Sequence, residues 1–95
     1  MNSFMNLLVK IDLSGAEIDV FEAYETKVLA LLNDHAAALE FRVRTKDGQS
    51  EFHLLRFPDE AALAAYRANP VRVALQAEWV RSGAQSEIVE VVHIV

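Results

Sequence analysis

At the centre of the chain, residues 39–57 read LEFRVRTKDGQSEFHLLRF. Apolar and polar side chains alternate over 39–45, and residues 50–57 form a second run that is typical of a strand. Between the two runs, Asp47 and Gly48 supply the positive φ angles that a tight hairpin turn needs. These features predict an antiparallel hairpin in the middle of the chain, and the elements on either side of it decide the fold.

Upstream of this hairpin, the sequence predicts a strand followed by a helix. Residues 6–13 alternate in the manner of a strand. Ser14 and Glu17 have the spacing of a capping box, in which each side chain accepts a hydrogen bond from a free backbone N–H at the helix start. The helix that begins there is expected to run to about Asp34. The core-facing side of the strand is predicted to carry Leu7, Val9, Ile11 and Leu13.

Downstream of the hairpin, two helical segments and a last strand are expected. Asp59 can cap a helix over 61–68 through its side chain. Asn69 and Pro70 break that helix and can start a second one over 71–81, because proline is tolerated at the first helical position. A final strand is predicted over 87–95.

This order of elements, β-α-β-β-α-β, predicts an α+β fold of the ferredoxin-like type. Right-handed crossovers then give a four-stranded antiparallel sheet in the order 4-1-3-2, with both helices on one face. The 95 residues leave room for a single domain, which we expect to span 1–95.

Composition and charge exclude several classes of protein. The chain has no cysteine, so disulfide frameworks, thiolate metal sites and cysteine nucleophiles are excluded. Nine basic residues stand against fourteen acidic ones, and the net charge of −5 argues against binding to nucleic acid. The sequence indicates neither a signal peptide nor a membrane-spanning stretch, so we expect no membrane partner and a cytoplasmic location.

The sheet face away from the helices is expected to be only partly polar. Alternation along the strands places Leu8, Leu55 and Phe57 on it, and the last strand is apolar on both sides. An uncovered apolar face on a small domain favours a partner. We therefore predict a homodimer in which two copies pack these faces together.

A group of polar and aromatic residues is predicted to line a cleft between the helices and one end of the sheet. Its members are Tyr24, His35, Arg56, Tyr66 and His93. Such a cleft could bind a planar anion, with histidine as a base and arginine stabilising a developing enolate or phenolate. The alternative is that the tyrosines are ordinary core residues and that Arg56 and His93 only reach water.

A second group of charged residues is predicted on the uncovered face of the sheet. Its members are Lys10, Arg42, Arg44, Glu51 and His53, with Phe57 beside them. Charges of both signs on neighbouring strands pair readily, so we interpret the group as an ion network in the dimer interface, with a central ligand site as the alternative. Glu51 and His53 could be two metal ligands, but no third ligand is identifiable, so no metal is expected. The chain also lacks a glycine-rich phosphate loop, and no cofactor is predicted.

Four sequence features carry a resemblance to a known family. They are Phe21-x-x-Tyr24-Glu25, His35, Glu51-x-His53-Leu54-Leu55-x-Phe57-Pro58 and Ala65-Tyr66-Arg67-x-Asn69-Pro70-x-Arg72. Over nearly its whole length the chain resembles the dimeric α/β-barrel superfamily, and more narrowly a branch of small bacterial proteins known only as a domain of unknown function. Ala36 and Ala37 depart from the pattern, because such relatives often have two glycines there. The resemblance implies ferredoxin-like protomers that close their uncovered sheet faces against each other.

The resemblance also implies a range of functions. Better-known members of the superfamily include cofactor-free quinone-forming monooxygenases, haem-degrading enzymes and muconolactone-type isomerases. The first hypothesis is a homodimeric protein that binds a small molecule without demonstrable catalysis. The alternative is a cofactor-independent monooxygenase or isomerase that acts on a small aromatic or unsaturated acid.

Overall fold

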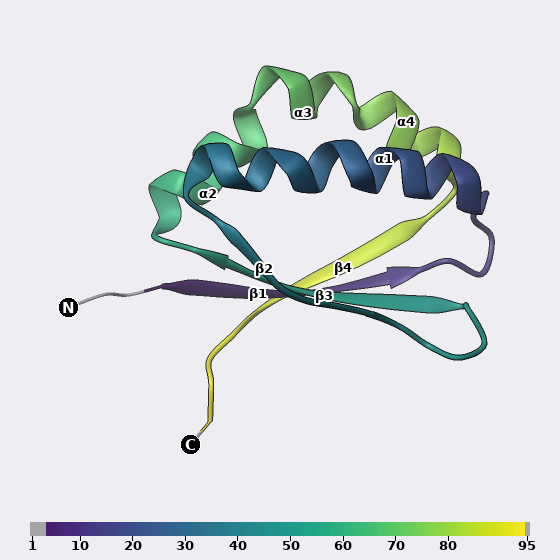
Figure 1. Ribbon diagram of the computed structural model, residues 1–95, viewed down its shortest axis with the longest axis horizontal. Helices are drawn as coiled ribbons and strands as arrows, with labels where there is room; N and C mark the ends of the chain where they lie inside the picture. The colour runs from purple at the N-terminus through teal and green to yellow at the C-terminus, as the bar shows by residue number, and fades with distance from the viewer. Residues whose placement is uncertain (1–3, 95) are drawn as a thin grey trace.

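The chain forms two layers, a four-stranded sheet and a set of helices that covers one of its faces (Figure 1). The computed structural model describes residues 4–94. Their strands are β1 (Met5–Asp12), β2 (Ala38–Arg44), β3 (Ser50–Phe57) and β4 (Gln85–Val91). Their helices are α1 (Ile18–Ala30), the 3₁₀ helix η1 (Leu31–His35), α2 (Glu60–Ala68), α3 (Pro70–Ala74) and α4 (Gln76–Ser82). None of these helices of residues 4–94 is long and apolar enough to cross a membrane.

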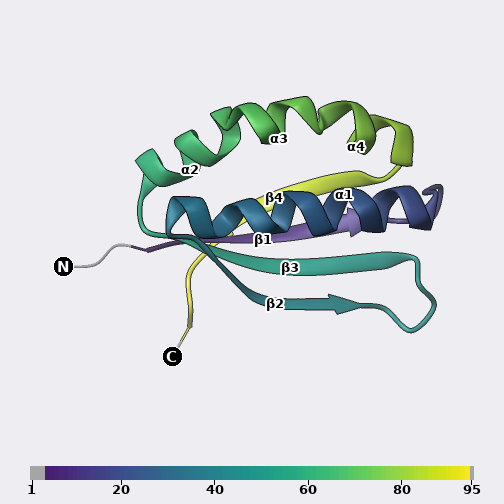
Figure 2. The same cartoon turned by 45° about the horizontal axis from the view of Figure 1, so that its top comes forward.

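The sheet confirms the predicted fold class and topology. Its strands pair in antiparallel fashion in the order β2-β3-β1-β4, which is the predicted order 4-1-3-2 seen from the other edge. The turn between β2 and β3 contains Gly48 with a φ of 74°, as predicted, whereas Asp47 does not have the positive φ that was predicted for it. Helix α1 and the segment from α2 to α4 lie on the same side of the sheet (Figure 2). The arrangement is the ferredoxin-like α+β fold.

The first helix begins later than predicted, and the capping box at Ser14 does not form. Ser14 donates its backbone N–H to Asp12 Oδ1 at 2.9 Å, which closes a local turn at the end of β1. Helix α1 then starts at Ile18, and Glu17 precedes it without a side-chain cap. An aspartate near the end of a strand competes for the backbone N–H groups that follow it, and the capping-box spacing alone does not reveal that competition.

The start signals of the later helices are confirmed. Asp59 caps α2 by accepting a hydrogen bond from the Ala62 N–H at 2.8 Å. Asn69 caps α3 in the same way and is followed by proline at the first helical position, as predicted. The segment predicted as one helix over 71–81 is two short helices, α3 and α4, that meet at Leu75.

Two helix ends use the left-handed region of the backbone. Gly83 follows α4 with a φ of 78°, and a Cβ at this position would lie 2.9 Å from the carbonyl oxygen of Gly15. Ala36 follows η1 with a φ of 55°. It therefore keeps the backbone conformation that favours glycine, at the place where the resembling proteins often have one.

The side chains of β3 point in the opposite direction from the prediction. The residues that face the helices are Glu51, His53, Leu55 and Phe57, all of which we expected on the uncovered face. The register with β1 decides this, because Val9 of the core lies directly opposite His53, and opposed residues share a face. Both faces of β3 carry apolar residues, so alternation alone could not choose between them, and a shift of one residue inverts every side chain.

The same inversion extends to β2. Arg42 and Arg44 lie opposite residues of the buried face of β3, so both arginines also point toward the helices. The register shifts between Leu39 and Phe41, which marks a bulge. Because of the bulge, Leu39 and Phe41 lie on opposite faces, and Leu39 shares the helix-facing side with the two arginines.

The sheet face away from the helices, which we call the open face, is covered by no other element of residues 4–94. Its apolar residues are Leu8, Phe41, Val43, Phe52, Leu54, Val89 and Val91. Val43 and Val89 are 52% and 51% exposed. Lys10 is exposed on this face, as predicted. The open face is thus partly apolar and partly polar, as expected, although several of its apolar members differ from those predicted.

Candidate functional site

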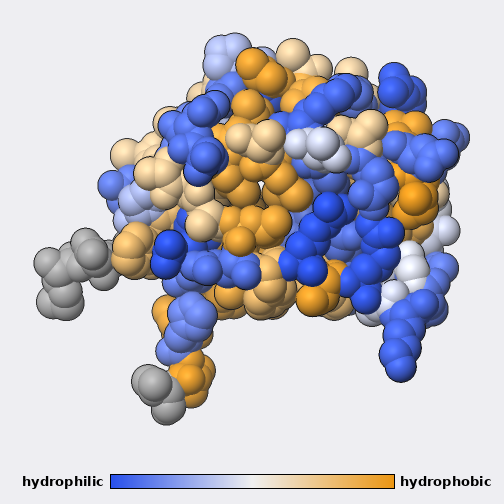
Figure 3. Space-filling view, in the orientation of Figure 1, coloured by the Kyte–Doolittle hydropathy of each residue, from blue (hydrophilic) through white to orange (hydrophobic). Residues whose placement is uncertain are grey.

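A cavity of about 220 Å³ lies between the helix layer and the sheet. In Figure 3, apolar side chains (orange) gather near the centre of the view, and hydrophilic side chains (blue) lie next to them. Most of the cavity lining is apolar as well. Its polar or charged members are Tyr24, Glu25, His53, Tyr66, Arg67, Arg72, Gln76 and Ser86. A mostly apolar cavity with a few polar groups is typical of small-molecule sites.

A buried cluster of charged residues adjoins this cavity and is centred on Glu51. The Glu51 side chain is 1% exposed. One carboxylate oxygen accepts a hydrogen bond from Arg42 Nε at 2.8 Å, and the other accepts one from Arg44 Nε at 2.8 Å. Burial acts to raise the pKa of Glu51, but hydrogen bonds from Arg42, His53 and Arg44 together hold that pKa below its ordinary value. Glu51 is therefore the ionised centre of the cluster.

Glu22 of α1 connects this cluster to the surface. Its carboxylate accepts a hydrogen bond from Arg42 Nη2 at 3.2 Å and another from Arg44. Glu22 and the two arginines are partly exposed, whereas Glu51 is not. The two guanidinium groups thus bridge a buried carboxylate on β3 and an exposed one on α1.

His53 joins the charged cluster to the cavity. It is 3% exposed, its Nε2 lies 2.6 Å from Glu51 Oε2, and its Nδ1 lies 3.8 Å from Glu25 Oε2. Burial lowers the pKa of His53, although the hydrogen bond to Glu51 opposes that shift. The ring is therefore neutral near pH 7. Since the ionised Glu51 can only accept, the hydrogen bond assigns the ring proton to Nε2 and leaves the Nδ1 lone pair toward Glu25.

Glu25 is the carboxyl group in the wall of the cavity. It lies on the buried face of α1 and is 4% exposed. Burial raises the pKa of Glu25 to about 7. The positive charge of Arg42 opposes this shift, and the negative charge of Glu51 adds to it. A carboxyl group that titrates near neutral pH can both give and take a proton there.

Aromatic side chains form much of the remaining wall. The rings of Tyr24 and Trp79 lie 5.3 Å apart, and those of Phe57 and Tyr66 lie 5.4 Å apart. Burial raises the pKa of both Tyr24 and Tyr66, so their phenols stay protonated near pH 7. The guanidinium carbon of Arg72 sits 4.9 Å from the centre of the Tyr66 ring. These surfaces suit a flat, apolar ligand.

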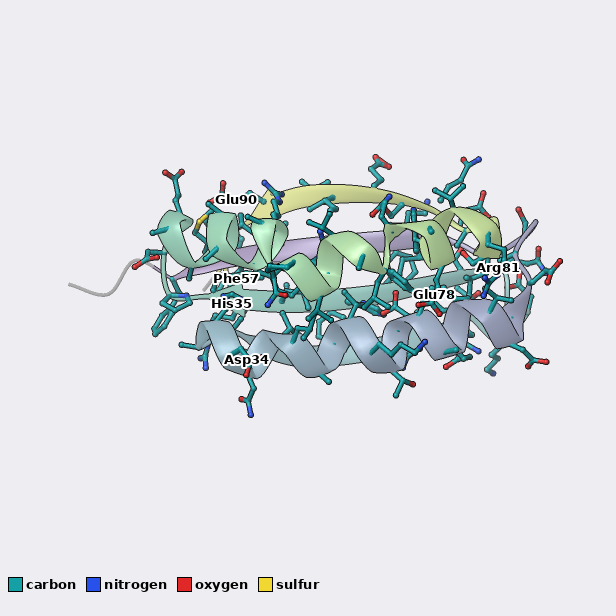
Figure 4. The ribbon with its side chains drawn as sticks, turned by 90° about the horizontal axis from the view of Figure 1, so that it is seen from above. Asp34, His35, Phe57, Glu78, Arg81 and Glu90 are labelled. Carbon is teal, nitrogen blue, oxygen red and sulfur yellow. The ribbon has the colours of Figure 1, made fainter. Side chains whose placement is uncertain are left out.

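The structure divides the five residues predicted to line the cleft. Tyr24 and Tyr66 line the cavity. His35 lies beside it, with its ring edge-on to Tyr66 and its Nε2 3.0 Å from the Asn69 side-chain nitrogen; in Figure 4, seen from above, it lies between the ribbons of α1 and α2. The prediction for the other two is wrong, because they lie away from the cavity. Arg56 pairs with Glu40 on the open face at 3.2 Å, and His93 is exposed beyond β4.

The predicted charged group is also divided. The structure brings four of its members together on the helix-facing side: Arg42, Arg44, Glu51 and His53. Placing them in a dimer interface is therefore wrong, since their partners are Glu22 and Glu25 of the same chain. Lys10 remains on the open face, and Phe57 is a fully buried core residue.

The sequence analysis did not single out Glu25 as a site residue. Phe21, Tyr24 and Val28 form the buried stripe of α1, and Glu25 stands one turn after Phe21 on the same stripe. Tyr24, Glu25 and Val28 follow Phe21 at three, four and seven residues, which is the spacing of one helix face. A charged residue is usually exposed unless it is paired. The helical pattern alone therefore did not show that Glu25 is buried.

Three members of the site could offer ligands to a metal ion. Glu25, Glu51 and His53 have potential ligand atoms that all lie within 4.8 Å of one another. Both oxygens of Glu51 are, however, held by Arg42 and Arg44, and His53 Nε2 is held by Glu51. A divalent cation would have to displace these hydrogen bonds next to two guanidinium groups. The donor set therefore does not favour a metal, and we assign none.

Comparison with known proteins shows which solved structures have a similar fold. No protein-family model and no curated protein sequence matches the chain. Among solved structures, SnoaB, a cofactor-independent oxygenase from Streptomyces nogalater, is 14% identical, with a TM-score of 0.81 over 100% of this chain and 96% of its own. A protein from Bacteroides thetaiotaomicron that is provisionally assigned as an antibiotic biosynthesis monooxygenase is 16% identical, with a TM-score of 0.82 over 98% of this chain and 91% of its own.

A protein from Caulobacter crescentus with the same provisional assignment is 13% identical, with a TM-score of 0.75 over 97% of this chain and 92% of its own. At these identities the likenesses concern the fold and not the chemistry. The chain has the ferredoxin-like fold of the antibiotic biosynthesis monooxygenase-like structures, which is the fold that the sequence and its resemblance predicted.

Proposed function

We propose that the protein binds a small planar acid in the cavity between helices and sheet, and that Glu25 takes a proton from it. The observation that carries this proposal is Glu25 itself, a buried carboxyl in the cavity wall whose pKa is raised to about 7. Burying such a group costs stability, so a functional use accounts for it better than packing does.

Proton transfer at this position needs a group that holds Glu25 in place and a means of stabilising the product anion. His53 lies next to Glu25 and is itself oriented by Glu51, so the two carboxyl groups are linked through one imidazole. The positive charge of Arg72 acts on Glu25 and also on Tyr24 and Tyr66. An enolate or phenolate formed in the cavity would be stabilised by that charge.

Two reaction types begin with this step. Return of the proton to a different carbon is an isomerisation, and reaction of the anion with dioxygen is an oxygenation. The likeness to SnoaB, a cofactor-independent oxygenase, supports the second. Binding without turnover is the other candidate function, and the mostly apolar cavity is the observation that favours it.

Hydrogen–deuterium exchange tests the proton transfer without knowledge of the natural substrate. Phenylpyruvate is a small aromatic acid with exchangeable protons next to its carbonyl group. We expect the protein to accelerate the exchange of these protons for deuterium in deuterium oxide. Proton NMR measures the exchange as the loss of their signal. Glu25→Gln should slow the catalysed exchange by about 100-fold or more, the usual effect of losing a general base.

Glu87→Gln is the matched control, because Glu87 lies on β4 opposite Lys10, on the open face. This variant should exchange phenylpyruvate as fast as the unmodified protein. Equal rates for Glu25→Gln and Glu87→Gln would contradict the role of Glu25. Phenylpyruvate that binds but does not exchange would leave binding as the function.

We also propose that two copies of the chain pack their open faces together. The support is the set of half-exposed apolar side chains there, which includes Val43 and Val89. Burying such side chains against a second copy stabilises the pair by roughly 25 cal/mol for each Å² removed from water. A twofold arrangement makes one self-complementary surface sufficient.

A further inference from the structure

Arg72 on α3 differs from the three arginines of the sheet. Arg42, Arg44 and Arg56 each form an ion pair with at least one carboxylate. Arg72 forms none within residues 4–94, and its Nε is buried without a hydrogen-bond partner. Its guanidinium is held against the ring of Tyr66 instead.

A buried guanidinium N–H without an acceptor is unfavourable unless something else accepts from it. Arg72 lines the cavity, so a molecule bound in the cavity can supply the missing acceptor. The planar guanidinium offers parallel N–H groups whose geometry matches the two oxygens of a carboxylate. Stacking against Tyr66 fixes the plane of that guanidinium in advance, so little freedom is lost on binding.

The charges that line the cavity favour a ligand with one negative charge. The lining contains two guanidinium groups, Arg67 and Arg72, and a single carboxyl group, Glu25. Glu25 is close enough to Arg72 for the positive charge to lower the pKa of its carboxyl, against the larger effect of burial. Arg72 and Glu25 therefore line the same cavity, together with the aromatic side chains of Tyr24, Tyr66 and Trp79.

We propose that Arg72 is the anion subsite of the cavity and that the ligand class is an aromatic monocarboxylate, with the carboxylate at Arg72 and the flat ring against Tyr24, Tyr66 and Trp79. This inference rests on the proposed function, because it assumes that the cavity is the binding site. The inference adds that the Arg72 guanidinium is the group that selects the ligand.

A pair of probes that differ only in charge tests the subsite. Cinnamate and cinnamamide have the same planar shape, and only the first carries a carboxylate. Isothermal titration calorimetry should show that cinnamate binds about 10 to 100 times more tightly than cinnamamide, as expected for a charge-assisted bond to a partly buried guanidinium. Arg72→Gln should remove this preference and bind both probes with the affinity of cinnamamide.

Two further variants separate the outcomes. Arg67→Gln removes the other, exposed arginine of the lining and should keep the preference for cinnamate. Arg72→Lys retains the charge without the planar pair of donors, so it should keep part of the preference and shows whether charge alone suffices. Circular dichroism confirms that each variant is folded.

Equal binding of cinnamate and cinnamamide to the unmodified protein would overturn the anion subsite while leaving the cavity as the binding site. Loss of the preference in Arg67→Gln but not in Arg72→Gln would also overturn it. If neither probe binds, the inferred ligand class is wrong, and the exchange of phenylpyruvate then decides separately whether proton transfer at Glu25 survives.

Discussion

Glu51→Gln should lower the free energy of unfolding by about 1–3 kcal/mol, the cost of leaving a buried hydrogen-bonding group without its partner. Glu51 is 1% exposed and accepts hydrogen bonds from Arg42, Arg44 and His53. The amide keeps one acceptor but turns its NH₂ group toward donors, so at least one buried N–H loses its partner. Urea unfolding at pH 7 and a fixed protein concentration measures the difference.

Glu22→Gln is the matched control for this prediction. It removes a carboxylate from the same two arginines, but Glu22 is 39% exposed. Water can replace the lost interaction there, so the expected loss is about 1 kcal/mol or less. If the two variants were equally stable, Glu51 would not be the centre of the cluster and the ion pairs on β3 would contribute little.

Val89→Asp should convert a dimer into a monomer. Val89 lies on β4 opposite Leu8, in the apolar part of the open face, and is 51% exposed in the single chain. In a twofold dimer the substitution places two new carboxylates in the interface, and the chain already carries a net charge of −5. Burying an unpaired carboxylate is unfavourable enough to prevent association at micromolar concentration.

Size-exclusion chromatography with light scattering measures this effect. The unmodified protein should have twice the 10.6 kDa mass of the chain, and Val89→Asp should have the mass of one chain. Val80→Asp is the control, because Val80 is 70% exposed on α4, away from the open face. A monomeric unmodified protein, or equal dissociation in both variants, would contradict the proposed dimer.

Local signals were sufficient to predict most of the fold. Asp47 and Gly48 mark the hairpin, Asp59 caps α2, and Asn69–Pro70 divides the helices, and each acts through its own side chain or backbone. Their effects do not depend on distant residues. Connection rules then left one topology for the four strands, which the structure has.

Local signals could not predict which side chains of β3 point toward the helices. Phe52 and Leu54 on one face are as apolar as Leu55 and Phe57 on the other, so the pattern does not distinguish them. The charged residues then misled the prediction, because Glu51 was expected in an interface and not beneath a helix. Glu51 can be buried because Arg42 and Arg44 of the neighbouring strand β2 donate hydrogen bonds to its carboxylate. Long-range pairing of this kind is not visible in local periodicity.

The candidate site was accordingly predicted in parts. Tyr24 and Tyr66 were correctly predicted to line the cavity, and His53 was recognised as a candidate but assigned to the wrong face. Glu25 and Arg72 belong to the resembling motifs, yet their burial and their position in the cavity wall appear only when the helices are packed on the sheet. A cavity is a property of packing between elements.

The pKa of the Glu25 carboxyl is the quantity on which proton transfer in the cavity depends most directly. It can be measured by following the carbon-13 shift of the labelled carboxyl from about pH 3 to about pH 10, a range that spans the ordinary and the raised pKa, with Glu25→Gln to assign the signal. Burial of Glu25 next to the ionised Glu51 predicts a midpoint of about 7. A midpoint near the ordinary value of 4.5 would contradict it, because Glu25 would then be fully ionised at neutral pH and solvated, and not a buried group ready to exchange a proton.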